Sequence, residues 1–135
     1  MPEGTVVRRV VDGDTVELSD GQLVRYIGID APEVHRREPS GWVMDPEPMA
    51  REATEFNRRL VEGRRVQLSY DVQTRDRFGR LLAYVTIDGV MVNEELLREG
   101  FAQLLTIPPN VKYAERFRQL AEEARRQSKG LWGAR

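Results

Sequence analysis

The sequence contains no cysteine and a single histidine, His35. Without cysteine, the chain offers no disulfide, no thiolate nucleophile and no sulfur ligand for a metal. One histidine also excludes the zinc sites that are built from several imidazoles. Any metal bound here would take mainly oxygen ligands from the protein, which is the preference of Ca²⁺ and Mg²⁺, with Mn²⁺ a weaker candidate.

The sequence also lacks an excess of positive charge and long runs of apolar residues. The chain has 21 Lys and Arg against 22 Asp and Glu, a net charge of −1, whereas proteins whose main task is to grip nucleic acid have a large basic excess. No apolar run approaches the length of a membrane span, and the first ten residues do not have the pattern of a signal peptide. With 135 residues, 40% hydrophobic and 32% charged, the chain is expected to form one domain, residues 1–135, that does not enter a membrane.

The spacing of apolar residues and turn signals predicts a small β-barrel with helices. Asp-Gly turns separate the first three β-rich segments, which indicates an antiparallel meander. Strands are expected at 5–11, 15–19, 23–29, 66–70 and 81–87, and helices at 48–63, 92–100 and 113–130. Five short strands with a helix between the third and the fourth are typical of the OB-fold. The predicted class is therefore α+β, a five-stranded OB-fold barrel with three helices.

Residues 34–48 are predicted to form a long polar loop, which in a compact domain is either functional or mobile. Two of its side chains allow alternatives. His35 is either a catalytic group or a solvated side chain, and Trp42 either stacks on a nucleobase or packs within the loop.

Several charged residues could form a catalytic site if the fold brings them close together. Asp14 and Asp30, with a backbone carbonyl, would suit a hard cation. Arg25 and Arg80 would bind phosphodiester oxygens, since each guanidinium can hold two oxygens at once. Glu33 would remain to take a proton from water. Each residue alone also has an ordinary explanation as a turn or strand residue with its charge in water.

Arg25 and Asp30 lie on opposite faces of a regular strand, because side chains alternate with a period of two. They can share a site only if the strand bends between them. Gly28 is the expected position of that bend.

Four segments carry a family resemblance. VVDGDTVEL, VRYIGIDAPE, RDRFGRLLAYV and VNEELLREGFA occur in this order, and KGLWG follows near the end. Together they resemble staphylococcal nuclease and its bacterial relatives, over about Val6 to Trp132. The resemblance implies an OB barrel with three helices and a Ca²⁺-dependent phosphodiesterase that hydrolyses DNA and RNA to 3′-phosphate products. It further implies single-stranded or frayed substrates and a secreted or cell-envelope location.

The same resemblance implies a role for each site residue. The implied metal ligands are Asp14, Asp30 and the carbonyl of Ala31, and the implied catalytic residues are Arg25, Arg80 and the general base Glu33. Arg77 and Phe78 match substrate-binding positions, and Asp12 and Thr15 match positions beside the metal ligands.

The chain departs from the family prototype around the substrate. Phe78 lacks the hydroxyl of the prototype's tyrosine, and Leu105-Thr106-Ile107-Pro108 stand where the prototype has tyrosines beside the nucleotide. Aromatic stacking on a base is therefore not expected from residues 105–108. The loop at 34–48 mixes arginines with acids, where the prototype has a lysine-rich loop.

Three functions fit these features of the sequence. They are a Ca²⁺-dependent nuclease, a non-catalytic nuclease-like module that binds nucleic acid or protein, and a Mg²⁺ or Mn²⁺ phosphoesterase for small substrates. The complete candidate catalytic set favours the nuclease over the binding module. The net charge of −1 does so too, because sequence-independent binding of nucleic acid comes from Lys and Arg.

Overall fold

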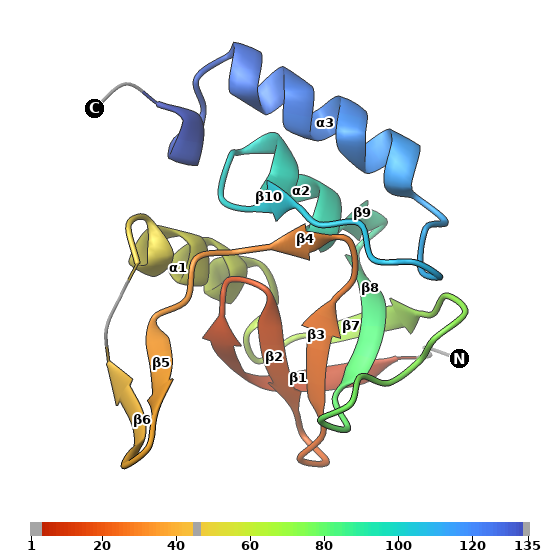
Figure 1. The fold of residues 1–135 in the computed structure, drawn as a ribbon. Coiled ribbons are helices and arrows are strands. Elements are labelled where there is room, and N and C mark those ends of the chain that lie inside the picture. Colours follow the sequence, from red (N-terminus) through yellow and green to blue (C-terminus); the bar gives the residue numbers. More distant parts are fainter. Residues whose placement is uncertain (1–3, 45–46, 134–135) are drawn as a thin grey trace.

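The predicted barrel forms the centre of the structure. The structure, a computed structural model, describes residues 4–44 and 47–133, and only the backbone of 35–38 and 42–44. Five strands close into the barrel (Figure 1). They are β1 (Thr5–Asp12), β2 (Thr15–Leu18), β3 (Leu23–Tyr26), β7 (Arg65–Ser69) and β8 (Leu81–Ile87).

Closure of the barrel depends on one parallel pair of strands. β1, β2 and β3 form the predicted antiparallel meander, and β1, β7 and β8 are also antiparallel neighbours. β3 then pairs with β8 in parallel, with Arg25 opposite Leu82, and a short strand β9 (Val90–Met91) extends the sheet beyond β8. The pairing sets Arg25 beside the start of β8, next to the turn that carries Arg80.

The chain bends at Gly28, as predicted. Gly28 has a φ of 86°, and the segment expected as one strand divides into β3 and a short β4 (Ile29–Asp30). β4 leaves the barrel and pairs with β10 (Gln103–Leu104). The ring of Phe117 lies so close that a Cβ at Gly28 would be 2.5 Å from its Cδ2. The bend therefore needs glycine both for its conformation and for space.

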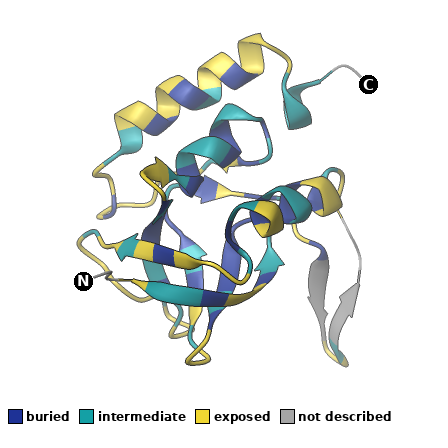
Figure 2. Ribbon diagram, turned by 180° about the vertical axis from the view of Figure 1, so that it is seen from behind, coloured by how far each residue is buried: buried dark blue, intermediate teal, exposed yellow. Residues whose placement is uncertain are grey.

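Three α-helices are present among the described residues. They are α1 (Ala50–Val61), α2 (Val92–Arg98) and α3 (Ala114–Arg126). In Figure 1, α2 lies between the barrel and α3, and α1 lies beside the barrel. Figure 2 shows the buried residues of α3 on its inner face, where Phe117 packs against the fully buried Tyr84 of β8 with ring centroids 6.0 Å apart. No helix in the described part of the chain has both the length and the apolar character of a membrane span.

The prediction that residues 34–48 form a long loop was wrong. Most of this segment is a β-hairpin of β5 (His35–Glu38) and β6 (Gly41–Met44) rather than a loop. Its turn is made by Pro39 and Ser40, and Gly41, the first residue of β6, has a φ of 124°. The sequence pattern does not predict these strands, because His-Arg-Arg-Glu shows no alternation of apolar and polar residues. The side chains of His35 and Trp42 lie outside those that the structure describes.

The last helix also ends earlier than predicted, at Arg126 rather than Gly130. Ser128 has a φ of 54°, and the amide of Lys129 turns back to the carbonyl of Ala124 at 3.0 Å. This is the hydrogen bonding that terminates helices. A separate 3₁₀ turn, η1 (Gly130–Trp132), follows.

Gly28→Ala should destabilise the protein more than the matched change Gly21→Ala. Both glycines have positive φ, 86° and 90°, but a Cβ at Gly21 meets nothing within 4 Å. The left-handed conformation should cost Gly21→Ala about 1–2 kcal/mol, and the collision with Phe117 should add about 1–3 kcal/mol at Gly28. Urea unfolding measures both. Equal losses would show that Phe117 yields without cost and that the close packing at the bend is unimportant.

Candidate active site

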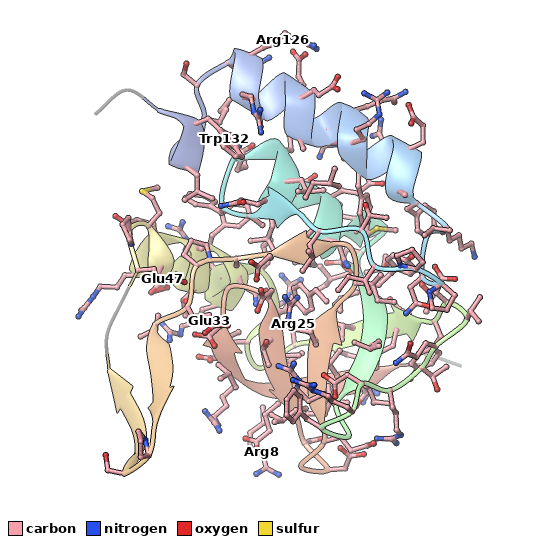
Figure 3. The ribbon with its side chains drawn as sticks, in the orientation of Figure 1. Arg8, Arg25, Glu33, Glu47, Arg126 and Trp132 are labelled. Atoms are coloured by element: carbon pink, nitrogen blue, oxygen red, sulfur yellow. The ribbon has the colours of Figure 1, made fainter. Side chains whose placement is uncertain are left out.

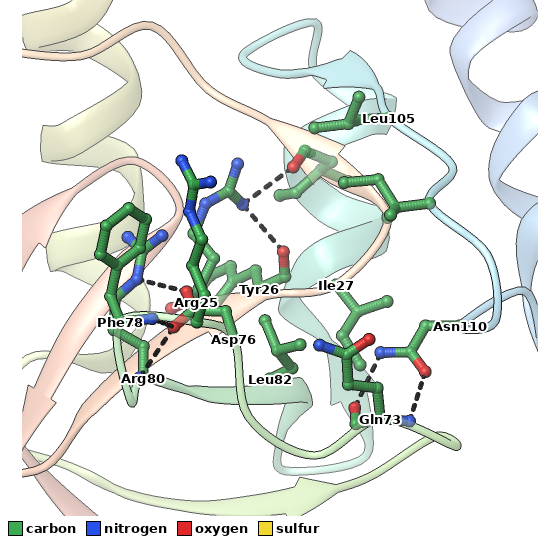
Figure 4. Close-up of a pocket in the computed structure, with 14 residues that line it drawn as sticks. Arg25, Tyr26, Ile27, Gln73, Asp76, Phe78, Arg80, Leu82, Leu105 and Asn110 are labelled. Carbon is green, nitrogen blue, oxygen red and sulfur yellow. Dashed lines mark hydrogen bonds and ion pairs between the residues drawn. The ribbon is translucent and has the colours of Figure 1, made fainter.

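Arg25 lies at the centre of the candidate site. Its side chain is 17% exposed, and Nη1 donates to the carbonyls of Tyr26 and Ile29, both at 2.9 Å. Nη2 lies 3.2 Å from Oδ1 of Asp30 and 3.4 Å from Oδ2 of Asp14. Figure 4 shows the guanidinium with its bonds to the two carbonyls. The two carbonyls flank the bend at Gly28, so the bend itself fixes the direction of the arginine.

Asp14 links the β1–β2 hairpin to the segment after β4. It is 3% exposed; Oδ1 accepts a hydrogen bond from Thr15 Oγ1 at 3.0 Å, and Oδ2 accepts one from the amide of Ala31 at 2.7 Å. Ala31 is itself buried. Asp14 therefore satisfies a buried N–H, a structural role that does not depend on any ligand.

Asp12 and Asn57 support this segment from behind. Oδ1 of Asp12 accepts from the amide of Val34 at 3.1 Å, and its carbonyl accepts from Nδ2 of the fully buried Asn57 at 3.1 Å. Asn57 also accepts a 2.7 Å hydrogen bond from the hydroxyl of Tyr26. Helix α1 is thereby tied to both the first hairpin and β3.

A cluster of carboxylates surrounds Arg25. The amide of Glu33 donates to Oε1 of Glu47 at 2.7 Å, and the amide of Glu47 donates to the carbonyl of Glu33 at 3.0 Å. Figure 3 shows Glu33 and Glu47 close together, with Arg25 nearer the middle of the barrel. Burial, followed by the charges of Asp12, Asp14, Glu47 and Asp30, raises the pKa of Glu33.

The pKa of Asp30 is raised for similar reasons. Burial raises its pKa, the charges of Asp14 and Glu47 add to this effect, and Arg25 opposes it. The neighbouring carboxylates that add to the effect of burial are the part of this shift that favours a bound cation.

Residues that could hold a metal are present, but sparse. Asp14 and Asp30 share one nitrogen of Arg25, and the carbonyl of Ala31 follows directly in the chain. No group of three or more His, Asp or Glu side chains suited to a metal occurs within the described residues. Two carboxylates and a carbonyl form an all-oxygen set that fits a hard cation such as Ca²⁺, with water and substrate oxygens completing its coordination.

A cavity of about 260 Å³ adjoins Arg25 and contains the second arginine (Figure 4). Arg80 lines it, with Nε bonded to Oδ2 of Asp76 at 2.7 Å. The guanidinium carbons of Arg77 and Arg80 lie 4.9 and 5.7 Å from the ring centroid of Phe78. Apolar side chains form much of the remaining wall: Ile27, Ile29, Leu82, Leu105 and Ile107.

The order of these segments along the chain matches a known family. A model described as staphylococcal nuclease homologue matches residues 23–134. The chain belongs to this family. It is 41% identical over 129 residues to a thermonuclease of Staphylococcus hyicus, covering 93% of this chain and 73% of that protein. It is 38% identical over 133 residues to a thermonuclease of Staphylococcus intermedius, covering 96% and 76%.

A third relative of this nuclease-family chain is the SPbeta prophage-derived endonuclease YokF of Bacillus subtilis. The two are 39% identical over 129 residues, which cover 92% of this chain and 42% of YokF.

The fold brings together the residues that the sequence pointed to. Asp14, Thr15, Arg25, Asp30 and Ala31 form one network. Asp12 and Glu33 flank this network, and Arg77, Phe78 and Arg80 lie around the adjoining cavity. The roles of these residues stay predictions.

Sequence reasoning missed two residues, Glu47 and Asp76. Glu47 reaches Glu33 only through the folded hairpin, and no local pattern indicates this contact. Asp76 does have a local signal, since Asp at the start of an Asp-x-x-Gly turn commonly accepts backbone N–H bonds.

Glu33→Gln should stabilise the metal-free protein at pH 7 but not in acid. Because the folded-state pKa of Glu33 is raised, the folded protein binds this proton more tightly than the unfolded chain. The free energy of unfolding therefore falls as the pH rises through the interval between the two pKa values. Glutamine removes that fall, so the gain should be present at pH 7 and absent at about pH 3, below the usual Glu pKa.

Thermal melts in EDTA at both pH values measure this effect. Glu123→Gln is a matched control of opposite sign, because a hydrogen bond from Arg126 lowers the pKa of Glu123. A gain that persists unchanged in acid would assign the effect of Glu33→Gln to packing rather than to charge.

Proposed function

We propose that this chain is a Ca²⁺-dependent nuclease that hydrolyses phosphodiester bonds in DNA and RNA and leaves 3′-phosphate ends. The family and the named relatives support a hydrolytic nuclease. The observation that carries the proposal is the sharing of Arg25 by Asp14 and Asp30 beside a cavity that also contains Arg80. This arrangement supports an oxygen-only cation site next to two groups that can bind phosphate.

Asp14, Asp30 and the carbonyl of Ala31 would hold the ion, which when bound supplies positive charge that polarises a phosphoryl oxygen. Arg25 binds the phosphate from β3 and Arg80 from the turn before β8, and both stabilise the charge that develops as water attacks phosphorus. Glu33 accepts the proton of that water. Its raised pKa makes it a stronger base than an ordinary glutamate. A 3′-phosphate product requires that the bond from phosphorus to the 5′-oxygen breaks.

The apolar cavity supports a preference for single-stranded or frayed substrates. Phe78 and Ile107 are 69% and 60% exposed beside the arginines, so a nucleobase can pack on them by dispersion and desolvation. A base stacked within a duplex cannot do so until the strands separate. The mixed charge of the chain supports few phosphate contacts beyond the site, and therefore a modest salt dependence.

The monomeric state and a secreted or cell-envelope location are proposed from the family alone. The binding-module alternative is less well supported, because each predicted catalytic residue is present, with Arg25 and Arg80 on one cavity and Glu33 within the influence of Asp14 and Asp30. The small-substrate phosphoesterase keeps one supporting observation, the absence of an aromatic side chain at Leu105 and Ile107 on the cavity wall.

A plasmid assay tests the proposal. Supercoiled DNA should be nicked with Ca²⁺, more slowly with Mg²⁺ because of its stricter octahedral geometry, and not in EDTA. Asp30→Asn should abolish nicking and reduce the Ca²⁺-dependent rise in melting temperature that binding to the folded state produces. Asp88→Asn, which removes an exposed carboxylate from the remote Arg64, should keep both.

Each other result decides against a part of the proposal. Nicking in EDTA contradicts the metal requirement, and plasmid binding without nicking in any metal supports the binding module. Product ends that a polymerase extends without prior phosphatase treatment contradict 3′-phosphate formation.

Both arginines should be needed for their shape as well as their charge. Arg25→Lys and Arg80→Lys keep the charge but lose the planar fork, so each should raise the activation barrier by about 2–4 kcal/mol, as expected for one preorganised donor. At Arg25, lysine also cannot satisfy two carbonyls and two carboxylates at once. Steady-state kinetics on single-stranded DNA measure the effect. Rates within a few-fold of wild type would contradict the assigned clamp.

Glu33→Gln should slow turnover by about 10²- to 10⁴-fold, the usual contribution of a general base, while Ca²⁺ affinity changes little. Single-turnover cleavage and calorimetric titration of Ca²⁺ measure the two quantities separately. Loss of Ca²⁺ binding in this variant would make Glu33 a ligand rather than the base.

A further inference from the structure

The carboxylate of Asp76 accepts three hydrogen bonds, all from its own turn. Oδ1 accepts the amides of Phe78 at 2.9 Å and Arg80 at 3.0 Å, and Oδ2 accepts Nε of Arg80 at 2.7 Å. The side chain is 17% exposed. Burial acts to raise the pKa of Asp76, but Arg80 and the two amides hold it below its ordinary value. The carboxylate is thus charged, largely shielded and fixed in direction.

The bond to Nε leaves the other end of the Arg80 guanidinium available. No hydrogen bond or ion pair of its Nη atoms with another described residue occurs, and the side chain is 30% exposed on the cavity that it shares with Arg25. The ring of Phe78 flanks the guanidinium at 5.7 Å. In Figure 4, the ring of Phe78 overlaps the Arg80 guanidinium, and a dashed line joins Arg80 to Asp76. Asp76 and Phe78 therefore hold the guanidinium while its two Nη nitrogens stay open to the cavity.

The turn itself has other supports. The amide of Asp76 bonds to the carbonyl of Arg80, and the amide of Gly79 bonds to the carbonyl of Asp76, both at 3.0 Å. Arg75 adds a brace, donating from Nη1 to the carbonyl of Gly79 at 2.9 Å and from Nη2 to Oε1 of Gln22 at 2.8 Å. A change at Asp76 that keeps an oxygen acceptor should therefore leave the turn in place.

We propose that Asp76 is a positioning residue, which holds Nε of Arg80 so that the Nη end of the guanidinium faces the scissile phosphate. The proposal rests on the nuclease function proposed above. Oδ1 orders the turn and Oδ2 orders the arginine, so one side chain couples the backbone of the turn to the direction of the phosphate-binding group. Preorganisation of this kind lowers the barrier, because the donor is not reoriented during the reaction.

Asp76→Asn separates the two functions of the carboxylate. The amide oxygen can still accept the backbone N–H groups, but Nδ2 then opposes Nε of Arg80, donor against donor. We expect kcat on single-stranded DNA to fall about 10- to 100-fold, the range that misplacement of a catalytic group produces, with a smaller change in KM. Asp88→Asn removes the same charge from another Asp–Arg pair and should leave kcat within about twofold, as a distant independent site does.

A double-mutant cycle distinguishes positioning from stability. If Asp76 acts through Arg80, Asp76→Asn should cost less than about twofold when added to Arg80→Ala. The same loss in both backgrounds would overturn the proposal, as would an Asp76→Asn variant with wild-type kcat. An inactive wild-type protein would instead contradict the nuclease function.

Proton NMR supplies a readout that needs no activity. The Hε proton of Arg80, identified by its loss in Arg80→Ala, should be shifted downfield and protected from solvent exchange in the wild type. In Asp76→Asn it should move upfield and exchange rapidly in a protein that still unfolds cooperatively. The melting temperature should fall somewhat, because a carboxylate with a lowered pKa stabilises the fold. An unchanged Hε signal in Asp76→Asn would show that the carboxylate does not hold the arginine, and would overturn the proposal.

Discussion

The guanidinium of Arg25 is the contact on which the candidate site depends. It binds carbonyls on both sides of the bend at Gly28 and lies between Asp14 and Asp30. The bend exists because glycine adopts a positive φ and leaves room for the ring of Phe117. A packing constraint between α3 and the bend that joins β3 to β4 thus determines how Arg25 meets Asp14 and Asp30.

The distribution of charge is more informative than its total. Within a net charge of −1, carboxylates gather around Arg25, and arginines line the cavity beside them. The acidic side of this arrangement suits a divalent cation, and the basic side suits a phosphodiester. Many of the remaining arginines form exposed ion pairs along helices, such as Arg118 with Glu115 and Glu122, which contribute little to stability and reduce the positive charge offered to nucleic acid.

Much of this arrangement could be predicted from the sequence. Turn signals between the β-rich segments predicted the barrel. Arg25 and Asp30 would lie on opposite faces of a regular strand, so a shared site required the bend that Gly28 makes. The hairpin at 35–44 could not be predicted, because its first strand is uniformly polar and carries no period of two. The hydrogen bonds that Asp14 accepts from the amide of Ala31 and that Glu47 accepts from the amide of Glu33 were also beyond reach. The first joins the β1–β2 hairpin to the segment after the bend, and the second forms only through the folded hairpin of β5 and β6. The Asp-x-x-Gly pattern could have identified Asp76 as an acceptor of backbone N–H bonds. The pattern does not show that its second oxygen accepts a hydrogen bond from Nε of Arg80.

The parallel pairing of β3 with β8 determines when the site comes into existence. Arg25 is made early in synthesis, and Arg80 reaches it only when a strand more than fifty residues later closes the barrel. Contacts between segments so distant in sequence form late and slowly in folding. A growing or partly unfolded chain therefore has one arginine of the pair without the other. If both arginines bind the phosphate as proposed, hydrolysis requires the completed fold, and a chain still being synthesised lacks a competent site.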